Sequence, residues 1–141
     1  MGGFEIFITI TFSVFVLFVY FSFVDRKRKR QSLNGLRSNG FNVSYLMNGV
    51  YANVAVDVHD RSAAFIYAKR VIKVPFDKIM SWQHTYVEKS SVVNGNHKHS
   101  IINNAIEFTI KDPAEPLLKI VVSDYDYARE WVARFSAILN D

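Results

Sequence analysis

Hydrophobic and polar positions divide this chain into a continuous apolar block, a short basic and polar stretch, and a long region in which the two kinds alternate. The block, residues 6–24, contains no charged side chain. A hydrocarbon core about 30 Å thick needs roughly 20 apolar residues of helix. Soluble strands usually run only about 3 to 10 residues, so the length of the block favours a helix over a buried strand. We therefore predict a single transmembrane helix that serves as a membrane anchor over residues 1–24.

Large apolar side chains favour the insertion of this anchor into a membrane. Ile, Val, Leu and Phe each favour insertion by about 0.3 to 0.6 kcal/mol near the centre of a membrane helix. The side chains that we expect to meet lipid include Ile6, Phe7, Phe12, Phe15, Leu17, Phe18, Phe21 and Val24. Homo-oligomerisation through this Phe-rich span is an open alternative.

Charges on either side give the span a direction. No Lys or Arg precedes it, whereas a basic run follows it: Arg26, Lys27, Arg28, Lys29 and Arg30. A secretory signal peptide has the opposite order, with positive charge before the apolar stretch. Basic residues close to a span stay on the cytoplasmic side, so we expect the N-terminus outside and the rest of the chain in the cytoplasm. The same run can also hold anionic lipid headgroups, at about 1 kcal/mol per basic residue.

The basic character of the chain belongs to this flank. The chain has 17 Lys and Arg against 13 Asp and Glu; without the five residues of the basic run, Asp25 and Glu5, residues 31–141 keep 12 against 11. A domain that binds nucleic acid presents a basic face of its own. We therefore expect no nucleic-acid partner. The absence of cysteine means that no disulfide holds the domain together.

Residues 25–40 form a basic juxtamembrane segment and linker. After the basic run, residues 31–40 are rich in Asn, Gly and Ser, which favours a flexible tether. The alternative is that the anchor helix continues through the basic residues and breaks at Asn34-Gly35, which shortens the tether.

The alternating region, residues 41–141, predicts one small β-rich domain. Short strands are expected at 54–58, 63–67 and 71–74, and a longer one at 80–88. In the first of them Val54, Val56 and Val58 share one face, and Ala55, Asp57 and His59 share the other. Pro75 ends the third strand because proline cannot donate to a sheet ladder.

Asn94-Gly95 predicts a hairpin, because both central residues of its turn need positive φ. The strand that follows carries Ile106, Phe108 and Ile110 on one face. Polar residues surround the tip, which we expect to project as an extended hairpin or as a mobile loop. The residues that we propose for partner contact are Asn94, Gly95, His97, Lys98 and His99.

A strand over 117–122 and an amphipathic helix close the chain. Ser123 is the expected helix cap, with Asp126 three positions later. One apolar stripe follows the helix: Ala128, Trp131, Val132, Phe135, Ile138 and Leu139. We expect Trp131 and Phe135 to plug one end of a β-barrel.

Six or seven antiparallel strands followed by one helix is the order of a pleckstrin-homology-like (PH-like) barrel. Residues 55–57, 64–67 and 74–79, followed by the alternating strand, the Pro-containing turn and the helix, resemble uncharacterised bacterial membrane-anchored proteins with a PH-like domain. The resemblance covers residues 51–140. It implies a scaffold that binds lipids, peptides or proteins. Together with the anchor and its basic flank, we expect a single-pass protein of the cell inner membrane.

The sequence contains no recognisable catalytic motif. There is no cysteine nucleophile, no G-x-S-x-G elbow and no phosphate-cradling glycine loop. His97 and His99 share a strand face, but the hairpin offers no acidic or thiol ligand beside them, so we expect no metal and no cofactor. We expect a non-enzymatic module that holds a protein partner at the membrane. The alternative is a protein that recognises anionic lipid through the basic run and the barrel surface.

Overall fold

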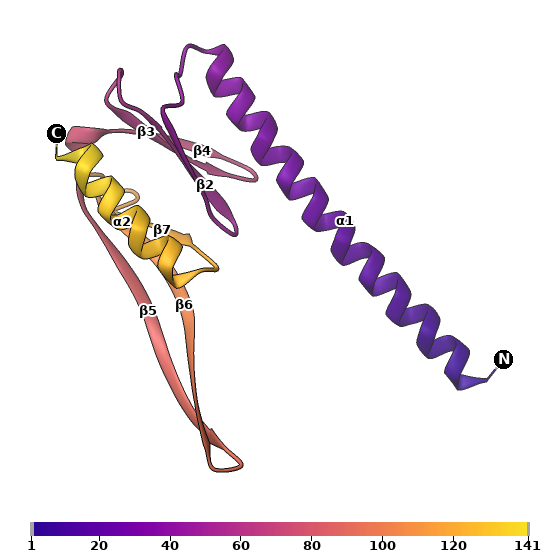
Figure 1. Ribbon diagram of the computed structural model, residues 1–141. Helices are drawn as coiled ribbons and strands as arrows, with labels where there is room; N and C mark the ends of the chain where they lie inside the picture. Colours follow the sequence, from indigo (N-terminus) through magenta and orange to yellow (C-terminus); the bar gives the residue numbers. More distant parts are fainter. Residues whose placement is uncertain (1, 141) are drawn as a thin grey trace.

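The computed structural model describes residues 2–140; Met1 and Asp141, the outer ends of the predicted division, lie outside the described residues. A long helix, seven strands and a C-terminal helix follow one another (Figure 1). The elements are α1 (Gly3–Ser38), β1 (Tyr45–Asn48), β2 (Ala52–Asp57), β3 (Ser62–Tyr67), β4 (Val71–Pro75), the short 3-10 helix η1 (Phe76–Lys78), β5 (Ile79–Val93), β6 (Asn96–Ile110), β7 (Leu117–Val121) and α2 (Tyr125–Leu139). The expectation of an N-terminal apolar helix, a mainly-β domain and a C-terminal helix is confirmed.

Helix α1 is long and apolar enough to cross a membrane, and its apolar window has no residue buried inside the molecule. The predicted anchor residues from Ile6 to Phe21 all expose about half or more of their surface, Phe18 as much as 72%. Figure 1 shows this half of α1 standing clear of the domain. A core helix of a soluble protein hides such side chains, so the exposure agrees with a membrane-facing segment.

The predicted flexible tether is wrong for most of its length. Residues 31–38 are the last turns of α1, which ends at Ser38, and Asn34-Gly35 does not break the helix. Leu33 and Leu36 pack against the domain and hold these turns in place. The chain then reverses at Gly40, whose φ of 90° suits glycine.

The strands form two antiparallel sheets and not the closed barrel that we expected. One has the order β1-β2-β3-β4 and the other the order β5-β6-β7. The turn between β1 and β2 joins them, because Val50 N donates to Val121 O at 2.8 Å. Gly49 is needed here: a Cβ at this position would lie 2.3 Å from Ala52 O and 2.9 Å from Val121 O.

The main core fills the space between the two sheets and α2. Phe65, Phe108 and Phe135 pack edge to face, with ring centroids 5.0 and 5.1 Å apart, and Trp131 adjoins Phe135 at 5.4 Å. Trp131 and Phe135 are 4% and 1% exposed, as the helix stripe predicted. Helix α2 is capped by Asp124, whose carboxylate accepts from Asp126 N at 3.2 Å, and not by Ser123.

A second, smaller core lies on the outer face of the first sheet. It consists of Phe41, Ala55, Ala64 and Ile66, with Leu33, Leu36, Val43 and Leu46 packed against it. The second face of β2, with Ala55 and Asp57, is therefore buried as well. Strands β2 and β3 are buried on both faces because α1 and its connection to β1 cover the outer face of the first sheet.

Two smaller differences concern the edges of this sheet. Strand β1 was not predicted from the sequence, because the first predicted strand begins at residue 54. Val58 lies beyond the end of β2 and is 43% exposed, so it does not join Val54 and Val56 in the core.

Asp57 accepts hydrogen bonds from Asn42 N at 2.9 Å and Asp60 N at 3.0 Å, which satisfies its buried carboxylate.

Candidate functional site

The outer parts of β5 and β6 form an extended hairpin that leaves the body of the domain, and we call residues 87–102 the distal hairpin (Figure 1). Of the two alternatives for this segment, the structure shows the extended hairpin. Asn94 and Gly95 form its turn with φ of 52° and 77°, as the dipeptide predicted. The proposed contact residues Asn94, Gly95, His97, Lys98 and His99 are all exposed and gather at this tip.

A bulge at the base re-aims the distal hairpin. Thr85 pairs with Ala105 and Val87 pairs with Ile102, so one residue of β5 faces two of β6. One of those two, Asn103, has a φ of 54°. Bulges of this kind bend a strand and increase its twist. The hairpin therefore departs from the sheet in its own direction.

An aromatic cluster fastens this base to α2. The rings of His84, Tyr86 and Tyr125 lie 4.7 to 4.9 Å apart. Hydrogen bonding to Tyr125 raises the pKa of Tyr86. His84 also bonds to the side chain of the buried Asn104, which donates to Val122 O at 2.9 Å. The base of the hairpin is thus built into the fold, and only its outer part is free of it.

The register sorts the tip residues onto two faces. His97 pairs with Val92 and His99 pairs with Ser90 on one face. On the other face Lys98 pairs with Ser91, and Ser100 pairs with Lys89. The two histidines therefore do share a face. Across residues 2–140 no group of three His, Cys, Asp or Glu side chains is placed to hold a metal ion.

The edges of the distal hairpin are open. Strand β7 pairs with β6 only over residues 105–109, and β5 has β6 as its partner strand. Unpaired backbone groups along an edge can accept a further strand. Four apolar side chains are exposed beside these edges: Val87, Val92, Val93 and Ile101. The hairpin combines strand edges, apolar side chains and charge on a surface that the fold itself does not use.

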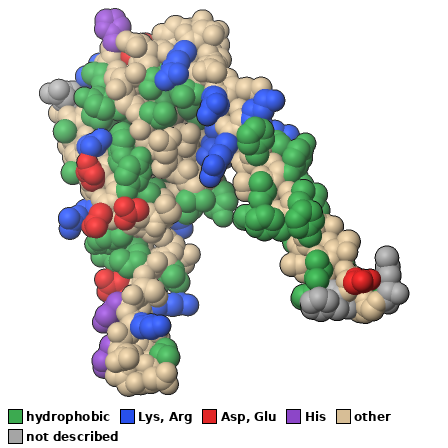
Figure 2. All heavy atoms as spheres, turned by 45° about the vertical axis from the view of Figure 1, so that its right-hand side comes forward, with side chains coloured by type: hydrophobic (Ala, Val, Ile, Leu, Met, Phe, Trp, Pro, Cys, Tyr) green, Lys and Arg blue, Asp and Glu red, His purple; other side chains and the backbone are tan. Residues whose placement is uncertain are grey.

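A second feature lies where α1 meets the domain. Figure 2 shows Lys and Arg side chains gathered at this junction. Arg26, Lys29 and Arg30 line a groove of about 360 Å³ together with Leu33 of α1 and, from β1, β2 and the turn between them, Leu46, Asn48, Gly49 and Asn53. We call this the basic groove.

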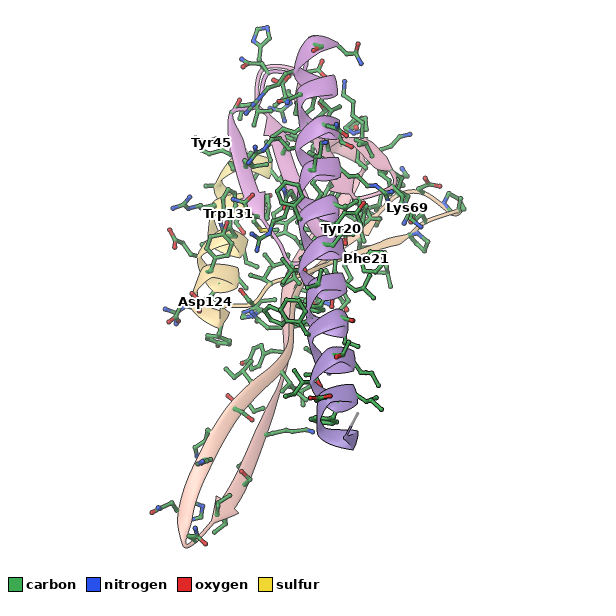
Figure 3. The ribbon with its side chains drawn as sticks, turned by 90° about the vertical axis from the view of Figure 1, so that its right-hand side faces the viewer. Tyr20, Phe21, Tyr45, Lys69, Asp124 and Trp131 are labelled. Atoms are coloured by element: carbon green, nitrogen blue, oxygen red, sulfur yellow. The ribbon has the colours of Figure 1, made fainter. Side chains whose placement is uncertain are left out.

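A different groove lies on the other flank of α1. Arg28 lines it with Lys69, which belongs to the turn between β3 and β4. Figure 3 places Tyr45 of β1 and Lys69 on opposite sides of α1. The basic run therefore does not act as one undivided patch, because its residues face two sides of the domain.

The charges of the basic groove are crowded. Burial, and then the guanidinium of Arg26, lower the pKa of Lys29, while Asp25 acts in the opposite sense. Gly49 N donates to the side-chain oxygen of Asn53 at 3.3 Å, which leaves the amide NH₂ of Asn53 as a donor.

Sequence reasoning found the basic run but missed its division and the polar wall opposite it. The missed wall residues are Asn48 and Asn53. The available signal was the spacing of Arg26, Lys29, Arg30, Leu33 and Leu36, which places cations and leucines on one helix face. Once the leucines dock on the sheet, the cations must face the domain too.

No family model, no curated protein and no solved structure matches this chain.

Proposed function

We propose that this chain is a single-pass inner-membrane protein, N-terminus outside, whose cytoplasmic PH-like domain is a non-enzymatic binding module that recruits a protein partner to the membrane. The exposed apolar half of α1 and the basic run that follows it support the anchoring and its direction. The order of seven strands and a C-terminal helix supports the PH-like scaffold.

The distal hairpin is the observation that carries partner binding. It extends beyond the sheet with open edges, and Val92 at its tip is 63% exposed. A hairpin that served only to join β5 to β6 could turn at the base, next to the bulge. The extra length gives no packing to the core and offers a strand edge for β-augmentation.

The direction of the hairpin supports a partner that lies at the membrane. The apolar half of α1 and the distal hairpin project from the domain on the same side (Figure 2). With α1 inserted, the tip is directed at the bilayer. Open strand edges do not enter lipid, because their backbone groups would stay unpaired there. A protein at the membrane surface or within it is therefore the partner that we propose.

Site-specific photo-crosslinking in native membranes tests this function. A photoreactive residue at Ser91 or Val92, on the two faces of the tip, should give an adduct with one defined protein. The same residue at the exposed Arg129 of α2 should not give it. Adducts with lipid alone, or the same pattern from all three positions, would refute partner binding through the hairpin.

A shortened hairpin supplies the second control. Replacing residues 90–99 by Asn-Gly keeps the pair Lys89 and Ser100 at the new tip. Because the core and the bulge are untouched, membrane insertion and thermal stability should stay those of the natural chain. Recovery of the partner by the full-length variant should be lost; unchanged recovery would place the contact elsewhere.

A further inference from the structure

The basic groove holds three cationic side chains on one face of a helix. Arg26, Lys29 and Arg30 lie at i, i+3 and i+4, which brings their side chains together on the surface of α1. Side chains of one charge repel one another unless an opposite charge lies among them. The residues that line the groove include no Asp or Glu; Asp25, one helical turn before Lys29, is the acidic residue that acts on Lys29 from outside the groove.

The docking of α1 fixes which way these cations point. Leu33 and Leu36 continue the same helix face and pack against the second core. A flexible tether would let the basic residues turn freely toward any surface. Here they face the turn between β1 and β2, and Asn48 and Asn53 complete the opposite wall.

The groove also lies at a defined depth. The apolar segment ends at Val24, and the first cation of the groove follows two residues later. If residues 6–24 cross the hydrocarbon core, the next turn of helix lies among the lipid headgroups. The ligand that meets such a site first is the phosphate of a lipid.

We propose that the basic groove binds the phosphate group of an anionic phospholipid of the cytoplasmic leaflet, between Arg26, Lys29 and Arg30 on α1 and Asn48 and Asn53 on the domain. Arginine and lysine make charge-assisted hydrogen bonds to phosphate oxygens, and the asparagine amides supply further donors. A bound phosphate would place a negative charge beside Lys29, whose pKa is lowered first by burial and then by the guanidinium of Arg26. The site rests on the proposed insertion of α1 but is independent of partner binding by the hairpin.

A pair of matched variants tests the site. R26Q/R30Q removes two charges from the groove, and K27Q/R28Q removes two from the same run outside it. The full chains are placed in nanodiscs of phosphatidylcholine with phosphatidylglycerol, extracted gently, and the retained lipid is counted by native mass spectrometry. The natural chain and K27Q/R28Q should retain one phosphatidylglycerol, and R26Q/R30Q should retain about tenfold less or none, for the loss of two charge-assisted contacts.

Equal losses in both variants would mean that only diffuse charge attracts the lipid, which overturns the site, and so would equal retention. Inorganic phosphate titrated into the natural chain in phosphatidylcholine nanodiscs distinguishes the source. It should give no saturable change; saturable binding that displaces phosphatidylglycerol would assign the groove to a soluble phosphate. Carbonate extraction of both variants shows separately whether the chain is inserted, so that failure of the anchor is not mistaken for failure of the groove.

Discussion

The two halves of α1 belong to one unbroken helix and meet opposite surroundings. Residues 6–24 are rich in large apolar side chains, yet none of their apolar window is buried within the molecule. Residues 25–38 are mostly polar, yet Leu33 and Leu36 dock them on the first sheet. Apolar content alone therefore does not say which part of a helix packs on a domain. The comparison teaches that the N-terminal half leaves its apolar side chains outside the fold, whereas the C-terminal half docks through two leucines that pack on the second core.

The largest effect should come from charging the N-terminal half. An arginine near the centre of a span costs about 2.5 to 3.5 kcal/mol. The variant F12R/F18R should therefore move most of the chain from the carbonate-resistant membrane fraction to the soluble or aggregated fraction. The control F12L/F18L keeps the apolar character and should stay in the membrane. Equal extraction of the two variants would show that lipid is not what the exposed half requires.

The next effect should come from undocking the C-terminal half. Leu33 and Leu36 are partly buried, and removal of both side chains in L33A/L36A should cost about 2 to 3 kcal/mol of docking free energy. Amides of residues 31–38 should then exchange with deuterium roughly thirtyfold to 150-fold faster. The main core does not contain these leucines, so its amides should keep their protection. A loss of protection throughout the domain would mean that the two cores are one cooperative unit.

A pair of glycine variants tests the surface beneath the helix against the helix itself. In G49A the new Cβ meets backbone oxygens of Ala52 and Val121, so we expect a loss of about 1 to 3 kcal/mol in the free energy of unfolding. In G35A the Cβ meets no atom within 4 Å, and alanine favours the docked turns by up to about 1 kcal/mol. Denaturation of the detergent-solubilised full chain should give opposite signs. Equal signs would contradict the tight contact at Gly49.

The smallest effect should come from an exposed ion pair beside the docked end. Lys73 Nζ lies 3.0 Å from Asp60 and also lies over the ring of Phe41, 5.7 Å from its centroid. The hydrogen bond from Lys73 lowers the pKa of Asp60. A carboxylate with a lowered pKa stabilises the fold above its ordinary pKa, and this contribution disappears as the pH falls through the lowered value.

D60N should therefore melt slightly below the natural chain at neutral pH, and the difference should vanish in acid. Thermal unfolding at a series of pH values measures it. Because both side chains are about half exposed, solvent screens the pair and the difference should be smaller than that of either glycine variant. A difference that grows as the pH falls would show that Asp60 acts through something other than Lys73.

The sequence predicted an element correctly where its hydrophobic pattern depends on one packing partner or on a local turn. The period of Ala128, Trp131 and Phe135 identified the core face of α2, and Asn94-Gly95 identified the hairpin turn. The same reasoning failed where a third layer intervened. Alternation along β2 and β3 does not reveal that a distant helix covers Ala55 and Ala64 on the second face of the sheet.

The two candidate sites, the hairpin tip and the basic groove, differ in the same way. The tip residues were found because a polar turn needs no tertiary information. The basic groove was missed because its far wall, Asn48 and Asn53, lies about twenty residues along the chain and acquires meaning only when Leu33 docks. Asparagine beside a turn is ordinary, and nothing in the sequence around Asn48, at the end of β1, or Asn53, in β2, points to a ligand.

One consequence of the unbroken α1 concerns mechanics. If α1 is inserted as proposed, it runs from the bilayer to the second core without a joint, and its C-terminal end is held on the first sheet. Membrane helices adjust their tilt when bilayer thickness changes. In this chain such an adjustment cannot be absorbed by slack between anchor and domain. A change of tilt would rotate the whole domain, and the hairpin tip would move the farthest. The thickness of the bilayer would therefore set which molecules the tip can reach.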